Sequence, residues 1–201
     1  NMRYSACSYD WFRAEQGWAE RSEAFVTGAS HLFGVVSGRA LELAELEADQ
    51  IDTIVMISST GIATPTIEAR VMNQLGFRDD VARVPVFGLG CAGGIAGLSL
   101  AARLAVAQPD SNVLVVVIEL CSLTFRRDEM TKSNIIATAL FGDGAAAAVL
   151  STKGKNSHGE IEFTGEHTWP DTIDVMGWRM DHVGFSAIFS RSIPDLALRD
   201  L

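Results

Sequence analysis

Short apolar runs alternate with helical patterns through the middle of the chain. Ile51–Ser58 (IDTIVMIS) and Val113–Ile118 (VLVVVI) are nearly continuous in apolar residues, which indicates strands buried on both faces of a sheet. Val84–Phe87 is a shorter run between them, and Ala145–Leu150 is a further strand-like run. Residues with helical spacing follow each of the first three runs. This order predicts an α/β fold with a mostly parallel sheet covered by helices.

The helices are predicted from apolar residues that recur every three or four positions. In the first of them, Arg13–Glu47, the expected buried stripe consists of Leu32, Val35, Val36, Leu43 and Leu46. The later helices are expected at Ile67–Leu75, after Pro65, then from Cys91 to Gln108, and at Ser133–Leu140.

The pattern changes at the polar turn Lys153–Gly159. Beyond it, Ile161–Thr164 and Gly184–Phe189 have the composition of strands. We therefore predict two parts, a first half at residues 1–150, which contains Cys91, and the beginning of a second half at residues 151–201.

Composition restricts the classes of function. The chain has 201 residues, of which 48% are hydrophobic and 20% charged, as expected for a globular chain with a sizeable core. Its net charge of -9 argues against a nucleic-acid partner, because phosphate binding requires clustered Lys and Arg. We also find no apolar run of the ~18 residues that a membrane span needs, so no membrane partner is expected.

The cysteines and the two ends of the chain carry further expectations. Cys7, Cys91 and Cys121 are odd in number and lack the spacing of metal ligands, so we expect a reduced, cytoplasmic protein without a metal site. The chain begins at Asn1 and stops at Leu201 in the middle of a pattern. We therefore expect it to be an internal piece of a longer protein.

Polar and thiol side chains follow the ends of three predicted strands. Ser59 and Thr60 follow the first strand, Cys91 follows the second, and Glu119 and Cys121 follow the third. Chemistry gathers at the carboxyl ends of strands in parallel sheets. We therefore expect these residues to meet at one edge of the sheet.

Three interpretations of Cys91 are open. The thiol follows a glycine-rich turn and precedes a helix, and a helix N-terminus stabilises a thiolate, so Cys91 can be a nucleophile. A buried cysteine that acts as a small apolar residue fits the spacing equally well. The third interpretation is a dinucleotide-binding loop, because Gly88, Gly90 and Gly93 have GxGxxG spacing. That loop requires an acidic residue about 20 positions further on, and Glu119 matches this requirement only loosely.

Five motifs occur along the chain: SSTG ending at Gly61, GLGCAGG at Gly88–Gly94, VIE at Val117–Glu119, TFR at Thr124–Arg126 and ALFGDGAAA at Ala139–Ala147. In this order and spacing they resemble the motifs of type III polyketide synthases, the chalcone synthase family of the thiolase superfamily. Residues Thr168–Phe185 are similar to the bacterial members of that family.

The resemblance implies the five-layer αβαβα thiolase fold, of which this chain would supply mostly the N-terminal half. It also implies an acyltransferase that performs decarboxylative Claisen condensation of malonyl-CoA onto a CoA-linked starter. The growing chain would be held as a thioester on the cysteine. Malonyl-CoA and acyl-CoA would be the substrates, no cofactor would be required, and the enzyme would be a homodimer.

Roles for individual residues follow from the same resemblance. Cys91 matches the nucleophile, and Phe141 matches the gatekeeper phenylalanine between the CoA tunnel and the cavity. Thr64 matches a position that reaches across the dimer interface in plant members, and Arg3 lies near the basic residues that hold the CoA phosphates. The positions around the condensing cavity are matched by Ser59, Thr60, Glu119, Cys121 and Thr124.

The resemblance also places two partners of the nucleophile elsewhere. The catalytic histidine and asparagine of the family lie beyond the position that matches Leu201, and His167 and His182 are outside the matching motifs. We therefore expect no condensing activity from residues 1–201 alone. Two alternatives stay open. One is a ketoacyl-ACP synthase III, for which Arg126-Arg127 is the only candidate docking patch, and the other is a non-catalytic protein that keeps the fold.

Overall fold

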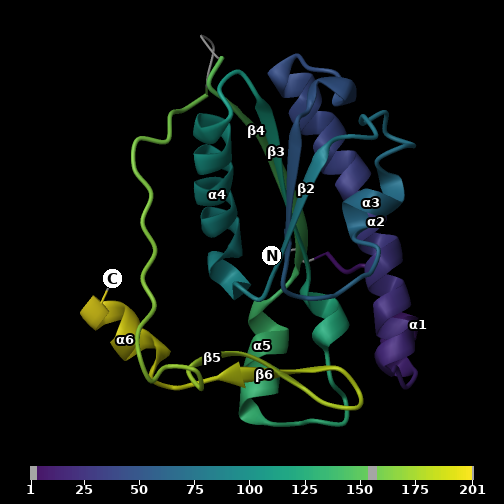
Figure 1. The fold of residues 1–201 in the computed structure, drawn as a ribbon. Coiled ribbons are helices and arrows are strands. Elements are labelled where there is room, and N and C mark those ends of the chain that lie inside the picture. Colours follow the sequence, from purple (N-terminus) through teal and green to yellow (C-terminus); the bar gives the residue numbers. More distant parts are fainter. Residues whose placement is uncertain (1–3, 154–157, 201) are drawn as a thin grey trace.

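The computed structural model describes residues 4–153 and 158–200 (Figure 1). The helices are α1 (Tyr9–Arg13), α2 (Trp18–Ala44), α3 (Ile67–Val71), α4 (Gly93–Ala107), α5 (Lys132–Leu140) and α6 (Ile193–Asp200). The strands are β1 (Thr53–Ser58), β2 (Ala82–Phe87), β3 (Asn112–Leu120), β4 (Asp143–Ser151), β5 (Met176–Met180) and β6 (Phe185–Phe189). Three short 3-10 turns are η1 (Ala48–Gln50), η2 (Gly90–Ala92) and η3 (Cys121–Thr124).

The main sheet has four strands in the order β2-β1-β3-β4. Strand β1 pairs in parallel with β2 and β3, whereas β4 runs antiparallel to β3. The predicted mostly parallel sheet is therefore confirmed. Because the three parallel strands point the same way, the residues that follow Ser58, Phe87 and Leu120 all lie at one edge of the sheet.

Helices cover both faces of this sheet, so the chain builds three layers of the α/β/α type (Figure 1). The core between α2 and the sheet contains Ile54 and Met56 of β1, and the core between α4 and the sheet contains Val55 and Ile57. Alternate residues of a strand point to opposite faces. All six residues of β1 are buried, because both faces are covered.

The buried face of α2 agrees only in part with the predicted stripe, of which Leu32, Val36 and Leu46 are half-buried against the core. Its core-facing residues are Phe25, Ala29, Phe33, Ser37, Ala40 and Leu41, whereas Val35 is 54% and Leu43 is 64% exposed. Both sets of positions have helical spacing, so the pattern alone does not choose between them. The face with the phenylalanines packs on the sheet side, where the Phe33 ring meets the Phe77 ring at 6.3 Å.

A second, two-stranded sheet is formed by β5 and β6. The expected strand at Gly184–Phe189 is confirmed, but the expected strand at Ile161–Thr164 is wrong: these residues have no regular structure, and Phe163 is 88% exposed. A strand needs a pairing partner, and β6 takes Met176–Met180 as its partner instead. Residues 158–175 run as an extended segment past α4 before they reach β5 (Figure 1). The division of the chain at residue 150 stays a prediction.

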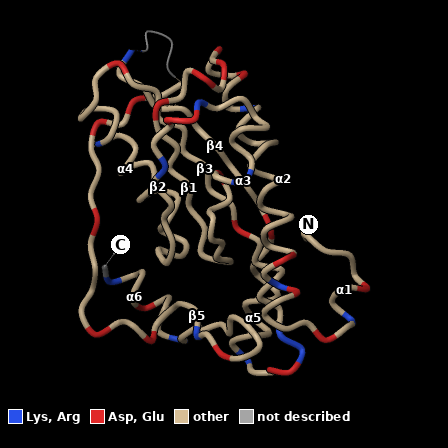
Figure 2. Tube along the Cα trace, turned by 45° about the vertical axis from the view of Figure 1, so that its right-hand side comes forward, with Lys and Arg blue, Asp and Glu red and all other residues tan. Residues whose placement is uncertain are grey.

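Charged residues lie mainly on the outer helices and loops (Figure 2). Within the paired strands β1 and β3, Glu119 is the only charged residue. It lies near the carboxyl end of β3, so a carboxylate stands at the edge where the predicted site residues were expected to meet.

Among the described residues, one helical segment is long and apolar enough to cross a membrane. It is Gly90–Ala107, with 18 residues and a mean hydropathy of 1.5. The expectation that no run reaches this length was therefore wrong. In this fold one face of the segment packs on the sheet, where Gly97, Ala101 and Ala105 are buried.

Candidate active site

Cys91 lies in η2, between the end of β2 and the start of α4. The turn that leads to it contains two glycines with positive φ, +93° at Gly88 and +54° at Gly90, a backbone region that disfavours residues with a side chain. The Cys91 side chain is exposed. The structure therefore excludes a buried, space-filling role and places the thiol beside the N-terminus of a 15-residue helix.

The position of α4 depends on two further glycines. A Cβ atom at Gly93 would lie 2.9 Å from Ile57 Cγ2, and one at Gly97 would lie 2.6 Å from Ile57 Cδ1. Only glycine allows the helix to approach β1 this closely. The close approach brings the first turn of α4, and with it Cys91, to the carboxyl end of β1.

Hydrogen bonds join the three predicted strand ends. The Gly90 N–H donates to Ser59 Oγ at 2.9 Å, next to Cys91. The Ser59 N–H donates to the Glu119 carboxylate at 2.9 Å, and Thr60 Oγ1 donates to Glu119 Oε2 at 2.7 Å. The backbone N–H of Leu120 in turn donates to Thr60 Oγ1 at 2.8 Å. The expected meeting of these residues at one edge of the sheet is therefore observed.

The Glu119 carboxylate is half-buried, and this burial raises its pKa, against the opposing effect of the hydrogen bonds from Thr60 and Ser59. The nearby Cys121 thiol is also half-buried. Burial first, and then the negative charges of Glu119 and Asp143, raise the pKa of Cys121 to about 12. Cys121 is thus kept as a neutral thiol at physiological pH.

The η3 turn is held by a residue that sequence reasoning missed. The Asp143 carboxylate accepts hydrogen bonds from the Ser122 N–H at 2.7 Å, from Ser122 Oγ at 2.6 Å and from the Ala6 N–H at 2.6 Å. Within the turn, Thr124 is buried and its Oγ1 donates to the Cys121 carbonyl at 2.8 Å. Asp143 belongs to the quoted FGDG motif, and that motif was the available signal.

Phe141 directly follows α5 as its C-cap residue, and its ring is half-buried among aromatic residues of the second sheet. The ring centroid lies 6.2 Å from that of Trp178 in β5 and 6.1 Å from that of Phe189 in β6, both at edge-to-face angles. Two residues further on, Asp143 binds the η3 turn. Phe141 is therefore tied to the turn that carries Cys121.

Other predicted residues are not part of this cluster. Thr64 is exposed, and its carbonyl accepts a hydrogen bond from Arg70. Arg3 lies outside the described residues. All four histidines are exposed: His31, His158, His167 and His182. None of them belongs to the elements that carry Cys91, Ser59 or Glu119.

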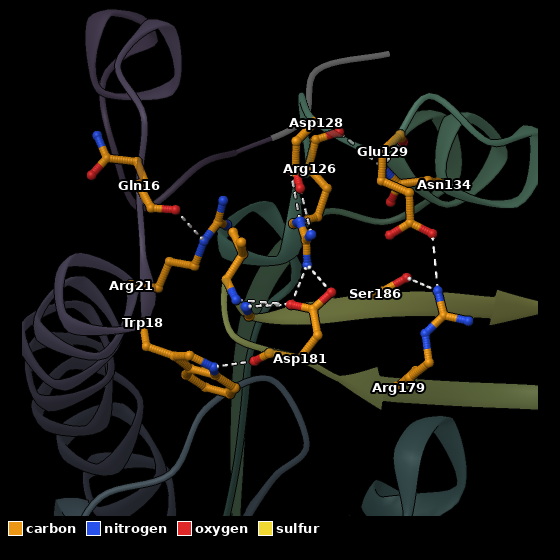
Figure 3. Close-up of polar contacts among 12 residues, drawn as sticks. Gln16, Trp18, Arg21, Arg126, Asp128, Glu129, Asn134, Arg179, Asp181 and Ser186 are labelled. Atoms are coloured by element: carbon orange, nitrogen blue, oxygen red, sulfur yellow. Dashed lines mark hydrogen bonds and ion pairs between the residues drawn. The ribbon is translucent and has the colours of Figure 1, made fainter.

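The candidate basic docking patch at Arg126-Arg127 is contradicted by the structure (Figure 3). Arg126 is only 3% exposed. Its guanidinium binds Asp128 on one side and Asp181 of the β5–β6 turn on the other, at 2.9 Å from Nη1 to Asp181 Oδ1. A buried, fully paired arginine is unavailable to a protein partner.

A metal site would need several His, Cys, Asp or Glu side chains close together. Over residues 4–153 and 158–200, no group of three or more His, Cys, Asp or Glu residues has a suitable arrangement. This edge of the sheet presents an accessible thiol at a helix N-terminus, with a carboxylate and hydroxyl groups beside it.

Comparison with known proteins gives consistent matches. The family model for the N-terminal domain of chalcone and stilbene synthases matches residues 20–154. A putative chalcone synthase of Bacillus subtilis is 44% identical over 155 residues, which are 74% of this chain and 42% of that protein. The 1,3,6,8-tetrahydroxynaphthalene synthase of Streptomyces peucetius is 37% identical over 198 residues, which are 96% of this chain and 52% of that protein.

Solved structures agree with these sequences. The crystal structure of 1,3,6,8-tetrahydroxynaphthalene synthase from Streptomyces coelicolor, described as a bacterial type III polyketide synthase, has a TM-score of 0.92 and 30% identity to this chain. The match covers 99% of this chain and 59% of that one. The chain spans about half the length of the curated relatives it matches.

Proposed function

Because this chain belongs to the chalcone and stilbene synthase family, we propose that it is the nucleophile-bearing part of a type III polyketide synthase. The reaction is decarboxylative Claisen condensation of malonyl-CoA onto a CoA-linked starter, with the intermediate held as a thioester on Cys91. The observation that carries the proposal is the exposed Cys91 thiol at the N-terminus of α4. The preceding residue, Gly90, donates its N–H to Ser59, and the Ser59 N–H donates to the Glu119 carboxylate.

Each step assigns a task to residues of this site. The Cys91 thiolate attacks the thioester carbonyl of the starter, the C–S bond to CoA breaks, and CoA leaves as its thiol after taking up a proton. The thiolate, and not the neutral thiol, is the attacking species. Thioester exchange divides a difficult carbon–carbon condensation into two easier steps.

The Phe141 ring acts on the second substrate. An apolar ring beside the malonyl carboxylate removes water from it and favours loss of neutral CO2. The resulting enolate then attacks the thioester on Cys91, which forms the new carbon–carbon bond and frees the sulfur. The space in which this occurs is bordered by the side chains of Ser59, Thr60, Glu119, Cys121 and Thr124.

Further features of the whole enzyme belong to the same proposal. Its substrates are CoA esters, with Arg3 as a contact for their phosphates, and the chemistry needs no cofactor. The enzyme is a homodimer in which Thr64 contacts the partner's cavity. We place it in the cytoplasm, where its three free cysteines stay reduced.

The test is consumption of radiolabelled malonyl-CoA by the full-length protein, with a thin-layer separation of the products. Cys91→Ala should abolish turnover, whereas Cys7→Ala, which removes a half-buried thiol outside the site, should retain it. Residues 1–201 alone should give no turnover above the Cys91→Ala background. Turnover by the full-length Cys91→Ala variant would overturn the proposal, and a preference for malonyl-ACP over malonyl-CoA would indicate a ketoacyl-ACP synthase III instead.

A further inference from the structure

The β5–β6 hairpin presents an aromatic face to Phe141. Trp178 pairs directly across the hairpin with Ala187, and residues that pair directly lie on the same face. Phe185 and Phe189, two positions on either side of Ala187, share that face. The small Ala187 side chain leaves room there for the indole of Trp178, which lies edge-to-face on Phe141 at 6.2 Å.

The aromatic contacts continue from Phe141 through the hairpin to α2. The Trp178 ring lies 6.0 Å from that of Phe185, and the Phe185 ring lies 5.2 Å from that of Trp18 in α2. The Trp18 indole N–H donates to the Asp181 carbonyl at 2.5 Å. The Trp178 ring therefore contacts both Phe141 and Phe185, and Phe185 in turn packs against Trp18.

The hairpin is anchored to the loop after η3 by charge (Figure 3). The Asp181 carboxylate accepts from Arg126 Nη1 at 2.9 Å and from the Val183 N–H at 2.8 Å. A second contact joins Arg179 of β5 to Glu129 at 3.2 Å. The buried Arg126 and the carboxylates on both sides of it hold the hairpin in one position relative to the turn that carries Cys121.

From these contacts we propose that Trp178 is a positioning residue that sets the place of the Phe141 ring and thereby selects the size of the acyl starter. The inference rests on the proposed function of Phe141. Trp178, Phe141 and Phe189 are all half-buried, so their rings border open space rather than fill a closed core. Without the indole, the Phe141 ring loses one of its neighbours and can turn aside. This movement enlarges the passage between the CoA tunnel and the cavity, at which Phe141 lies.

The activity test compares starters of two sizes in the full-length enzyme. Trp178→Ala should raise the ratio of kcat/KM for a dodecanoyl-CoA starter over an acetyl-CoA starter by about tenfold or more, as pocket changes of this size do. Trp178→Phe keeps a ring and should stay within about threefold of the parent ratio. Phe163→Ala removes an aromatic side chain that is 88% exposed and should leave the ratio unchanged.

A second measurement does not depend on turnover. The Phe141 N–H donates to the Ala137 carbonyl at 2.9 Å, so its hydrogen exchange reports how firmly the end of α5 is held. Exchange of the peptide that contains Phe141 should be about tenfold faster in Trp178→Ala and unchanged in Phe163→Ala.

The outcomes separate the two levels of the proposal. An unchanged starter ratio in Trp178→Ala refutes the selection role, even if exchange accelerates, and unchanged exchange refutes the contact that holds Phe141. A parent enzyme without malonyl-CoA turnover refutes the proposed function and the selection role with it. The exchange experiment then still decides whether Trp178 holds Phe141.

Discussion

The three cysteines should react with iodoacetamide at very different rates, and Cys121 is the most informative of them. Only the thiolate reacts. With its pKa raised to about 12, Cys121 is ionised to about one part in ten thousand at pH 8, whereas an ordinary thiol of pKa near 8.5 is about one quarter ionised. The difference in thiolate concentration is roughly 2,000-fold.

Part of this difference is offset, because a thiolate of higher pKa is a stronger nucleophile. With a Brønsted coefficient of about 0.45, a rise of roughly 3.5 pKa units increases the intrinsic rate by about 40-fold. The net expectation is that Cys121 reacts about fifty times more slowly than an ordinary thiol. Its half-buried position slows the reaction further. Cys91 is exposed and should be modified first.

The assay is timed alkylation of the native protein at pH 8 with limiting iodoacetamide, followed by proteolysis and mass spectrometry of each cysteine-containing peptide. The same reaction in guanidinium chloride is the control, in which all three thiols should react at similar rates. Glu119→Gln removes a negative charge that raises the pKa of Cys121, and should accelerate its reaction selectively.

The pH dependence gives the decisive result. Because its pKa is about 12, the Cys121 rate should keep rising by about tenfold for each pH unit from pH 7 to pH 10. A rate that levels off near pH 9, or a Cys121 that reacts as fast as Cys91, would refute the account of its environment.

Three further predictions concern the supports of the site. Gly97→Ala forces a methyl group against the Ile57 side chain and should lower the free energy of unfolding by about 1–3 kcal/mol in urea denaturation. Gly94→Ala, whose Cβ would have an ordinary contact at 3.9 Å, is the matched control and should change it little. Asp143→Ala leaves three donors without their acceptor and should cost about 2 kcal/mol by the same assay; a loss below about 0.5 kcal/mol would contradict its role. The hydrogen bond from Arg126 holds the pKa of the Asp181 carboxyl below its usual range. The ion pair therefore stabilises the folded state above the unfolded pKa near 3.9, and this stabilisation is lost as the pH falls below that value. Asp181→Asn should therefore unfold more easily than the parent at pH 7, and thermal melts should show the gap narrowing below about pH 4; a gap independent of pH would argue against the ion pair.

The local elements of the main sheet could be predicted from the chain because their signals are local. The buried run that became β1, the edge at which Ser59 meets the turn before Cys91, and the thiolase-like fold were all expected and are confirmed. The glycine-rich turn before Cys91 was also expected from the sequence. The positive φ values of Gly88 and Gly90 explain why glycine is favoured at those positions.

The expectations that failed share a physical cause. Both faces of α2 carry helically spaced apolar residues, so the choice of the Phe33 face over the Val35 face depends on the sheet against which the helix packs. The expected strand at Ile161–Thr164 had a suitable composition but no partner, because β6 pairs with β5. The adjacent Arg126 and Arg127 were interpreted as a surface patch, but Arg126 lies between the carboxylates of Asp128 and Asp181.

By itself, the sequence determined the order of strands and helices in the main sheet, the placing of Cys91 at the start of a helix, and the family to which the chain belongs. The tertiary structure decided which side chains surround that thiol. Ser59 and Glu119 are 60 residues apart in the chain, and Arg126 and Asp181 are 55 apart. Local periodicity reports which face of an element is apolar, but it carries no record of which distant polar groups will meet there. Those pairings follow from the packing of helices on the sheet, because only the folded chain brings a buried charge and its partner within hydrogen-bonding distance.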